Sequence, residues 1–448
     1  CLLISFTGDA GDRHHQRRRA RRELAGSVGR RTRADCDTVT SMQTEDDRPH
    51  VAFAIQSLHR AAGGAERVLV DVANGLHRRG YPVTVLTYQE RNGPSFYPLD
   101  YGIRQIDGRK RHSRRGRGTP LGTLEGPARR HRLVAVALWL IQHAPKTWHL
   151  RRTLRIARPD VAIGFLPSTF PYLALAATGS GVPVVASLHN VPDRDLGGDP
   201  LRWDQNPVDV GLRRRALRTS AANTVLLPSF REQIDDDLRA KTYVIPNLIE
   251  PYVGPLADVS TDPVDNVILA VGRLSPAKDH ATLISAWAML EAEYPAWRLR
   301  IVGDGPLYDE VVAQIERLEL RRAAVDEPTS EIEQAYTSAK FLVMSSIHEG
   351  FGLVTAEAMA CGLPVIGFAD CEGTNEIVLD GENGVLVDPG GDRVEALAAA
   401  MRRLIDDEEA RRALAAAAPA TVERFRPEPV LDAWEHLIAD VCNGTVPS

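Results

Sequence analysis

Two carboxylates, Glu349 and Glu357, stand eight positions apart in the stretch HEGFGLVTAEAMACG. Gly350 and Gly352 permit a close turn between them, and the small residues that follow predict a helix beginning near Phe351 or Gly352. The unpaired N–H groups at such a helix start suit a phosphate. Glu357 could then accept hydrogen bonds from a ribose, and Glu349 would face what extends beyond the phosphates. The pattern predicts a nucleotide-sugar site; the alternative is a first-turn carboxylate beside a solvated glutamate.

Two cations precede these carboxylates in the stretch AVGRLSPAKDH, which ends a predicted strand and opens a predicted helix. Arg273 and Lys278 stand where a diphosphate would bring its negative charge, and charge-assisted hydrogen bonds contribute about 1.5–3 kcal/mol each. The alternative is a pair of surface cations at a helix start, where they gain nothing from the helix dipole. The pattern therefore favours diphosphate binding.

Two weaker signals lie in the first half of the chain. Gly63 and Gly64, in LHRAAGGAERV, let a ligand approach the backbone just before a predicted helix, although a glycine pair alone is a weak motif. His189 follows a predicted strand in SLHNVP, at the end of the sheet where open α/β folds bind ligands. A structural role for this histidine stays open beside the functional one.

The elements that must position these side chains alternate along the chain. Short β-branched runs separated by helical stretches predict parallel βαβ units. The alternation stops in a segment rich in Pro and Asp near residues 248–264 and then restarts. We therefore predict an α/β protein with two Rossmann-like domains, 49–250 and 265–425, facing each other across a ligand-binding cleft. A C-terminal helix at about 428–442 is expected to pack back on the first domain.

Composition excludes several function classes. The 448 residues include 54 basic and 59 acidic side chains, a net charge of −5, so nothing global points to nucleic acid. The five cysteines show neither metal spacing nor a paired framework, which predicts a reduced, cytoplasmic compartment. No stretch approaches the roughly 20 apolar residues that a transmembrane helix needs.

Two basic segments interrupt this pattern. Residues 1–48 are arginine-rich, aperiodic and poor in large apolar residues, which predicts a disordered leader rather than a nucleic-acid or membrane arm. Residues 104–132 are basic and glycine-rich, and the apolar stretch LVAVALWLIQHA follows them. For this second segment a solvated insertion loop and a surface for anionic lipid or a phosphorylated acceptor both stay open.

Taken together, GGAER, SLHN, IPN, GRLSPAK, GDGP and above all EGFGLVTAE with AMACGLPVI resemble the retaining glycosyltransferases of family 4. The resemblance covers roughly residues 51–440 and implies the GT-B fold, the α/β architecture predicted above. It also implies a transfer that needs neither a metal nor another cofactor. The sequence offers no Asp-X-Asp motif where Mg²⁺ would bridge the phosphates, and its DDD run at 235–237 lies on a predicted helix away from every motif.

The resemblance implies a role for each matching residue. Arg273 and Lys278 resemble the diphosphate clamp, Glu357 the ribose ligand and Glu349 the carboxylate that faces the donor sugar. His189 resembles the residue near the reacting face of the sugar. The backbone contacts to sugar and phosphate match Gly63, Gly64, Phe351, Gly352 and Leu353.

The implied function is retaining transfer of a hexose or N-acetylhexosamine from a nucleoside-diphosphate sugar, UDP favoured over GDP, to a glycan or lipid-linked acceptor. Cell-envelope or polysaccharide synthesis, in the cytoplasm or on the inner face of the plasma membrane, is the implied setting. A retaining phosphorylase of the same fold and a non-catalytic nucleotide-binding protein are the alternatives. Two departures from the family pattern are a shortened region at 319–332 and Glu372, where relatives often have proline.

Overall fold

The computed structural model describes residues 48–59, 63–88, 95–107, 132–198 and 207–447. Almost all of the predicted leader, 1–48, therefore lies outside the described residues, as does most of the basic segment 104–132. Residues Arg48–Ser448 form one unit by their contacts.

The first half of this unit is a parallel sheet of seven strands in the order β3-β2-β1-β4-β5-β6-β7. Valine, isoleucine and alanine dominate most of these strands and are buried on both faces, as parallel sheets require. The basic segment 104–132, which breaks the predicted alternation, begins with the edge strand β3, because its first four residues pair with β2. The strand bounds are β1 (Val51–Ile55), β2 (Val83–Thr87), β3 (Arg104–Asp107), β4 (Val161–Phe165), β5 (Val184–Ser187), β6 (Ala222–Val225) and β7 (Thr242–Val244).

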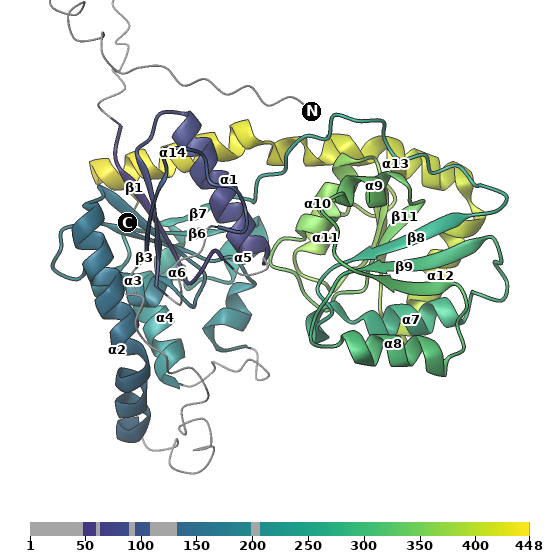
Figure 1. Cartoon of the computed structure of the whole chain (residues 1–448), viewed down its shortest axis with the longest axis horizontal. Helices are drawn as coiled ribbons and strands as arrows, with labels where there is room; N and C mark the ends of the chain where they lie inside the picture. The colour runs from purple at the N-terminus through teal and green to yellow at the C-terminus, as the bar shows by residue number, and fades with distance from the viewer. Residues whose placement is uncertain (1–47, 60–62, 89–94, 108–131, 199–206, 448) are drawn as a thin grey trace, which may run out of the picture. The chain divides into compact units, whose positions relative to one another are not determined.

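Helices cover both faces of this sheet (Figure 1). Val51, Phe53 and Ile55 of β1 share one buried cluster with α1 (Gly64–Arg78) and α14 (Pro427–Asn443). Ala52 and Ala54, which point to the other face, pack with α2 (Arg132–Ala157) and α3 (Phe170–Ala177). The C-terminal helix α14 is thus part of the first half. The other helices here are the π-helix η4 (Arg194–Gly198), α4 (Pro207–Thr219), α5 (Pro228–Glu232) and α6 (Asp236–Arg239).

The second half is a parallel sheet of six strands in the order β10-β9-β8-β11-β12-β13. The region that looked shortened in sequence still forms the edge strand β10, which pairs with β9. Neither helix nor strand lies between β7 and β8, where the chain passes from one sheet to the other. The bounds are β8 (Asn266–Val271), β9 (Trp297–Val302), β10 (Ala323–Asp326), β11 (Phe341–Met344), β12 (Val365–Phe368) and β13 (Gly384–Val387).

Two helical layers also enclose this second sheet (Figure 1). Ile268 and Ala270 of β8 pack with α7 (His280–Ala288), α8 (Tyr308–Arg317) and α12 (Arg393–Asp406). Val267 and Leu269 belong to the cluster on the other face, with α9 (Ile332–Thr337), α10 (Leu353–Ala360) and α13 (Glu408–Val422). Shorter elements are η5 (Pro276–Lys278), α11 (Thr374–Ile377) and η6 (Glu423–Phe425).

Each sheet has one point where the strand order reverses, between β1 and β4 and between β8 and β11. Ligands of open α/β sheets bind outside the carboxyl ends of the strands at such points. The glycine pair follows β1, the two predicted cations follow β8, and Glu349 follows β11. Sheet topology therefore brings most of the predicted residues to the edges where ligands bind.

Candidate functional site

The segments that follow β8 and β11 are bound to each other. The backbone N–H of Ile347 donates to the carbonyl of Ala277 at 2.8 Å, and Ser345 Oγ donates to the carbonyl of Lys278 at 2.8 Å. These bonds fix the single turn η5 against the strand end that carries Glu349. A side chain on one segment is thereby held in reach of a side chain on the other.

Lys278 and Glu349 form an ion pair at this junction. Lys278 Nζ lies 2.5 Å from Glu349 Oε1, and Ser346 Oγ donates to the same oxygen at 2.7 Å. Only 21% of the lysine side chain and 11% of the glutamate side chain are exposed. An ammonium has three donors, so Lys278 can keep this contact and still donate to a diphosphate.

The turn between the two glutamates packs tightly. Gly352 adopts a left-handed conformation, φ +89°, and caps α10, which begins at Leu353 rather than at the predicted Phe351 or Gly352. A Cβ on Gly350 would lie 2.3 Å from the carbonyl oxygen of His189, so only glycine fits where the first half approaches. The glycines are thus required by backbone geometry and by close packing.

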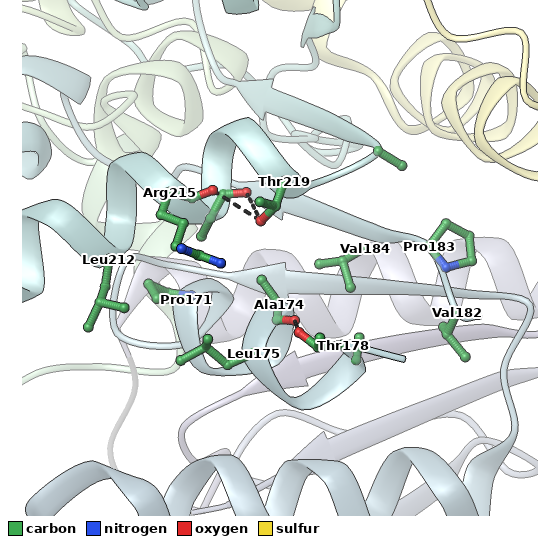
Figure 2. A pocket seen from close by; sticks show the side chains of 13 residues that line it. Pro171, Ala174, Leu175, Thr178, Val182, Pro183, Val184, Leu212, Arg215 and Thr219 are labelled. Atoms are coloured by element: carbon green, nitrogen blue, oxygen red, sulfur yellow. Dashed lines mark hydrogen bonds between the residues drawn. The ribbon is translucent and has the colours of Figure 1, made fainter. Parts of the chain in front are cut away.

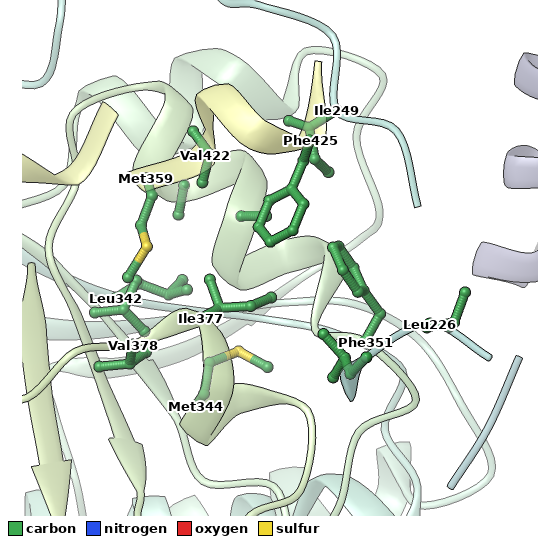
Figure 3. Packing of buried hydrophobic residues seen from close by; sticks show 14 of the residues in the cluster. Leu226, Ile249, Leu342, Met344, Phe351, Met359, Ile377, Val378, Val422 and Phe425 are labelled. Carbon is green, nitrogen blue, oxygen red and sulfur yellow. The ribbon is translucent and has the colours of Figure 1, made fainter. Parts of the chain in front are cut away.

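Phe351 anchors this turn in the hydrophobic core. Its ring is 2% exposed and meets the Phe425 ring edge to face, with the centroids 5.0 Å apart. Figure 3 shows Phe351 among buried side chains that include Ile377 and Met359. The side chain therefore serves packing, which leaves the backbone as the part of Phe351 that could meet a ligand.

Glu357 lies in the second turn of α10, as the sequence predicts. Its Oε1 accepts from Arg67 Nη1 at 2.6 Å, and its Oε2 accepts from the Tyr336 hydroxyl at 3.0 Å. Burial raises the pKa of this carboxyl, while Arg67 and Tyr336 oppose that rise. The contact with Arg67 joins the two halves, because Arg67 belongs to α1.

Sequence reasoning assigned no role to Arg67, although the motif GGAER contains it. The available signal was a cation in the first turn of a helix, where the dipole disfavours positive charge. The same argument drew attention to Lys278. An unfavourable position for a cation suggests a partner outside the helix, and here that partner is Glu357.

His189 is a buried, neutral imidazole. Its ring stacks on Phe165 with the centroids 4.2 Å apart, and its Nε2 lies 2.9 Å from Ser187 Oγ. Burial lowers the pKa of His189 to about 3, so the ring carries no charge near neutral pH. Phe165 stacks in turn on Trp434 of α14, which places the C-terminal helix behind this histidine.

The remaining predicted residues differ in their surroundings. Gly63 caps α1, and a Cβ on Gly64 would lie 2.8 Å from Leu353 Cδ1, so the starts of α1 and α10 are in contact. Arg273 is exposed just beyond β8, and no hydrogen bond or ion pair holds it within the part of the chain that the structure describes. The structure therefore does not bring the arginine of the predicted clamp into contact with the glutamates.

Further contacts between the halves involve the loop that departs from the family pattern. Gln233 Nε2 donates to Glu372 Oε1 at 2.9 Å, and Ser229 Oγ donates to Glu376 Oε1. A proline at position 372 could not accept the first bond. The departure thus supplies a polar contact that the sequence did not predict.

A cavity of about 370 Å³ lies elsewhere, between α3, α4 and the start of β5 (Figure 2). Mostly apolar side chains line it, together with Arg215, Thr178 and Thr219. The lining residues Val182–Val184 place it at the amino end of β5. The predicted site residues stand at the opposite, carboxyl ends of the strands, so this cavity is not part of the candidate site. Within the described ranges, no group of three or more His, Cys, Asp or Glu side chains could hold a metal ion, and no helix is both long and apolar enough to cross a bilayer.

Two family models match the chain. The model described as Glycosyltransferase Family 4 matches residues 62–252, and the one described as Glycosyl transferases group 1 matches residues 258–421. The first match covers β2 to β7 of the first sheet, and the second covers β8 to β13 of the second sheet.

Curated relatives resemble the chain over different lengths. An exopolysaccharide phosphotransferase of Streptomyces coelicolor is 28% identical over 65% of this chain and 30% of its own length. An amylovoran biosynthesis glycosyltransferase of Erwinia amylovora is 33% identical over 39% of this chain and 48% of its own. The chain thus spans less than half the length of these two relatives. An α-1,4-N-acetyl-D-galactosaminyltransferase of Campylobacter jejuni is 24% identical over 88% of this chain and 99% of its own.

Solved structures share the fold. HepE of Anabaena, in complex with UDP and glucose, superposes with a TM-score of 0.64 at 22% identity, covering 88% of this chain and all of the other. Sucrose-phosphate synthase of Thermosynechococcus elongatus superposes with a TM-score of 0.69 at 20% identity, covering 89% of this chain and all of the other. The prediction of a GT-B architecture with two Rossmann-like halves is confirmed.

Proposed function

Since this chain belongs to the family 4 glycosyltransferases, we propose that it transfers a hexose or N-acetylhexosamine from a nucleoside-diphosphate sugar with retained configuration. The acceptor is a glycan or a lipid-linked glycan of cell-envelope or polysaccharide synthesis. UDP is favoured over GDP as the nucleotide. The Campylobacter jejuni relative supports this acceptor class, because its name specifies a PP-undecaprenol-linked glycan, and Anabaena HepE supports UDP.

One observation carries the proposal: Glu349 and Glu357 flank the start of α10, and each already has a polar partner. Lys278 contacts the first at 2.5 Å, and Arg67 contacts the second at 2.6 Å. A helix start favours phosphate, and carboxylates favour hydroxyl groups. A ligand with hydroxyls at both ends of a diphosphate fits this order, with the ribose at Glu357 and the sugar at Glu349.

The proposed reaction is a front-face substitution at the anomeric carbon. The acceptor hydroxyl forms the new C–O bond while the bond from that carbon to the diphosphate oxygen breaks, and the departing oxygen takes the acceptor proton. Lys278, Arg273 and the N–H groups at the start of α10 stabilise the charge that develops on the diphosphate. His189, as a neutral imidazole, contacts the sugar near its reacting face.

A panel of UDP- and GDP-sugars, with release of the nucleoside diphosphate as the readout, tests the function. Release from one donor in the presence of a glycan acceptor, with the anomeric configuration retained in the product, supports the proposal. A requirement for inorganic phosphate as the co-substrate would identify a phosphorylase. Nucleotide binding without release, across donors and acceptors, would identify a binding protein.

We also propose that the transfer needs no metal or other cofactor, since the diphosphate charge is assigned to side chains and backbone. Turnover in EDTA should equal turnover in added Mg²⁺. A loss in EDTA that Mg²⁺ restores would contradict this assignment.

A further inference from the structure

The ion pair between Arg67 and Glu357 links the first turn of α1 to the second turn of α10. Arg67 Nη1 lies 2.6 Å from Glu357 Oε1, and the glutamate side chain is only 15% exposed. The hydroxyl of Tyr336, from α9, donates to the other oxygen at 3.0 Å. The carboxylate is therefore held at both oxygens, and one of the two partners belongs to the other half of the protein.

This arrangement leaves hydrogen-bonding capacity at Glu357. A carboxylate offers about four lone-pair sites, and Arg67 and Tyr336 use one on each oxygen. Each oxygen keeps a site for a hydroxyl group, and the two oxygens have the spacing of a bidentate acceptor. The paired hydroxyls of a ribose are such a two-donor group.

We propose that Arg67 and Tyr336 are positioning residues that orient Glu357 for the ribose, so that the ribose end of the donor site is complete only when α1 lies against α10. The inference rests on the proposed function, because it takes Glu357 as the ribose ligand. It goes further in assigning part of nucleotide recognition to a residue of the first half.

The charges around the pair explain why Arg67 matters. Asp71 lies one turn along α1, with its Oδ2 3.7 Å from Arg67 Nε, and Glu250 and Glu333 add further negative charge nearby. Arg67 is the counter-charge to Glu357 and Asp71, and Arg78 also lowers the pKa of Asp71. Tyr97 and Tyr336 interact electrostatically with Arg67 as well. Without it, Glu357 would stay buried among negative charges and would take up a proton more readily. A protonated Glu357 loses acceptor sites for the ribose.

Calorimetric titration with UDP and with 2′,3′-dideoxy-UDP tests the inference. Arg67→Ala should weaken UDP about tenfold, the scale of one charge-assisted hydrogen bond. It should leave the dideoxy nucleotide unchanged, because that ligand lacks the hydroxyls that Glu357 holds. Equal losses with both ligands would show that Arg67 contacts the diphosphate or acts through the fold, and would overturn the inference.

Arg78→Ala is the matched control, since Arg78 ends the same helix and pairs at the surface with Asp100 at 2.7 Å. UDP affinity should not change in this variant. If Arg67→Ala does not fold, Arg67→Lys and Tyr336→Phe provide the same test. Each should lower UDP affinity about threefold and leave the affinity for the dideoxy nucleotide unchanged. No loss with UDP in either of these folded variants would overturn the inference.

A double-mutant cycle separates this inference from the proposed function. Once Glu357→Gln has removed the carboxylate, Arg67→Ala should change UDP affinity less than about twofold. Undiminished loss in that background would contradict a role through Glu357. If Glu357→Gln itself left UDP affinity intact, the ribose assignment of the proposed function would fail instead.

The pH profile gives a readout that a purely structural role would not move. UDP affinity of the Arg67→Ala variant, divided by that of the unaltered protein, should fall as the pH is lowered over the range in which both proteins stay folded. Loss of Arg67 lets the buried carboxyl of Glu357 take up a proton at a higher pH. The titration of UDP itself cancels in this ratio. A ratio that stays constant over this range would overturn the inference.

Discussion

The two ends of the candidate site are built differently. At the sugar end, Glu349 takes both of its described side-chain contacts from its own half, Lys278 at 2.5 Å and Ser346 at 2.7 Å. At the ribose end, Glu357 takes one contact from its own half, Tyr336, and one from α1 of the other half. The Glu349 carboxylate can therefore be held in place within one folded half, whereas the Glu357 carboxylate needs both.

Two glutamates of one short motif are thus held in place by different parts of the fold. Glu349 sits where two loops of one sheet are bonded to each other, so its position follows from the fold of that sheet. Glu357 sits on a helix face that meets a second sheet's helix. Changes in the approach of the halves should therefore affect nucleotide recognition before they affect the Lys278–Glu349 pair.

The largest expected effect comes from removing the cations. Lys278→Ala and Arg273→Ala should each lower turnover by about 10²–10³, since both are proposed to stabilise charge on the departing diphosphate. Steady-state rates with the donor identified by the panel measure this. Arg317→Ala, an exposed arginine in the last turn of α8, is the control and should keep full activity. Arg273 is exposed and unpaired in the described structure. Full activity in its variant would show that it does not belong to the diphosphate clamp.

The second prediction tests the comparison directly. Glu357→Ala should weaken the free nucleoside diphosphate by about tenfold or more, because the ribose loses its acceptor. Glu349→Gln should leave that affinity nearly intact and lower turnover, because only the sugar end changes. Calorimetry beside rate measurements distinguishes the two. Equal loss of diphosphate affinity in both variants would mean that the two ends have been assigned wrongly.

The third prediction concerns the cost of burying charge at the ribose end. Burial raises the pKa of Asp71 from 3.8 to about 6. A raised carboxyl pKa destabilises the folded protein above that pKa, and the penalty disappears as the pH falls below the unfolded value near 4. Asp71→Asn should therefore raise the free energy of unfolding by about 1–3 kcal/mol at pH 7.5.

The same substitution should have no stabilising effect near pH 3, below the unfolded pKa, where Asp71 is protonated in both states. Urea denaturation at the two pH values measures the difference. A variant that is less stable than the unaltered protein at pH 7.5 would show that the contact with Arg67, 3.7 Å away, outweighs burial.

The smallest expected effect on the site itself comes from a change outside it. We propose that the basic segment, most of which lies outside the described residues, attracts anionic lipid with about 1 kcal/mol per basic residue near the surface. Neutralising Arg109, Arg111, Arg114 and Arg115 should reduce sedimentation with anionic vesicles, and added salt should do the same. Binding that ignores both changes would reject membrane association, and donor affinity should be unaffected in either case.

Local sequence determined the elements and the order of the site along the chain. Hydrophobic runs and turn residues identify most strands, and GFG followed by small residues identifies the start of α10 and the second-turn position of Glu357 within two residues. These features depend on neighbours in the chain, through φ/ψ preferences and hydrogen bonds a few residues long. They could be predicted because their causes are local.

Only tertiary structure decided which side chains meet. Arg67 and Glu357 are far apart in sequence, as are Lys278 and Glu349, and no local preference specifies either contact. Edge strands β3 and β10 were missed for the same reason: they carry charged residues, and pairing with a neighbouring strand, rather than their own pattern, makes them strands. The charge of His189 also depends on burial beneath α14, so its low pKa follows from packing that the sequence does not display.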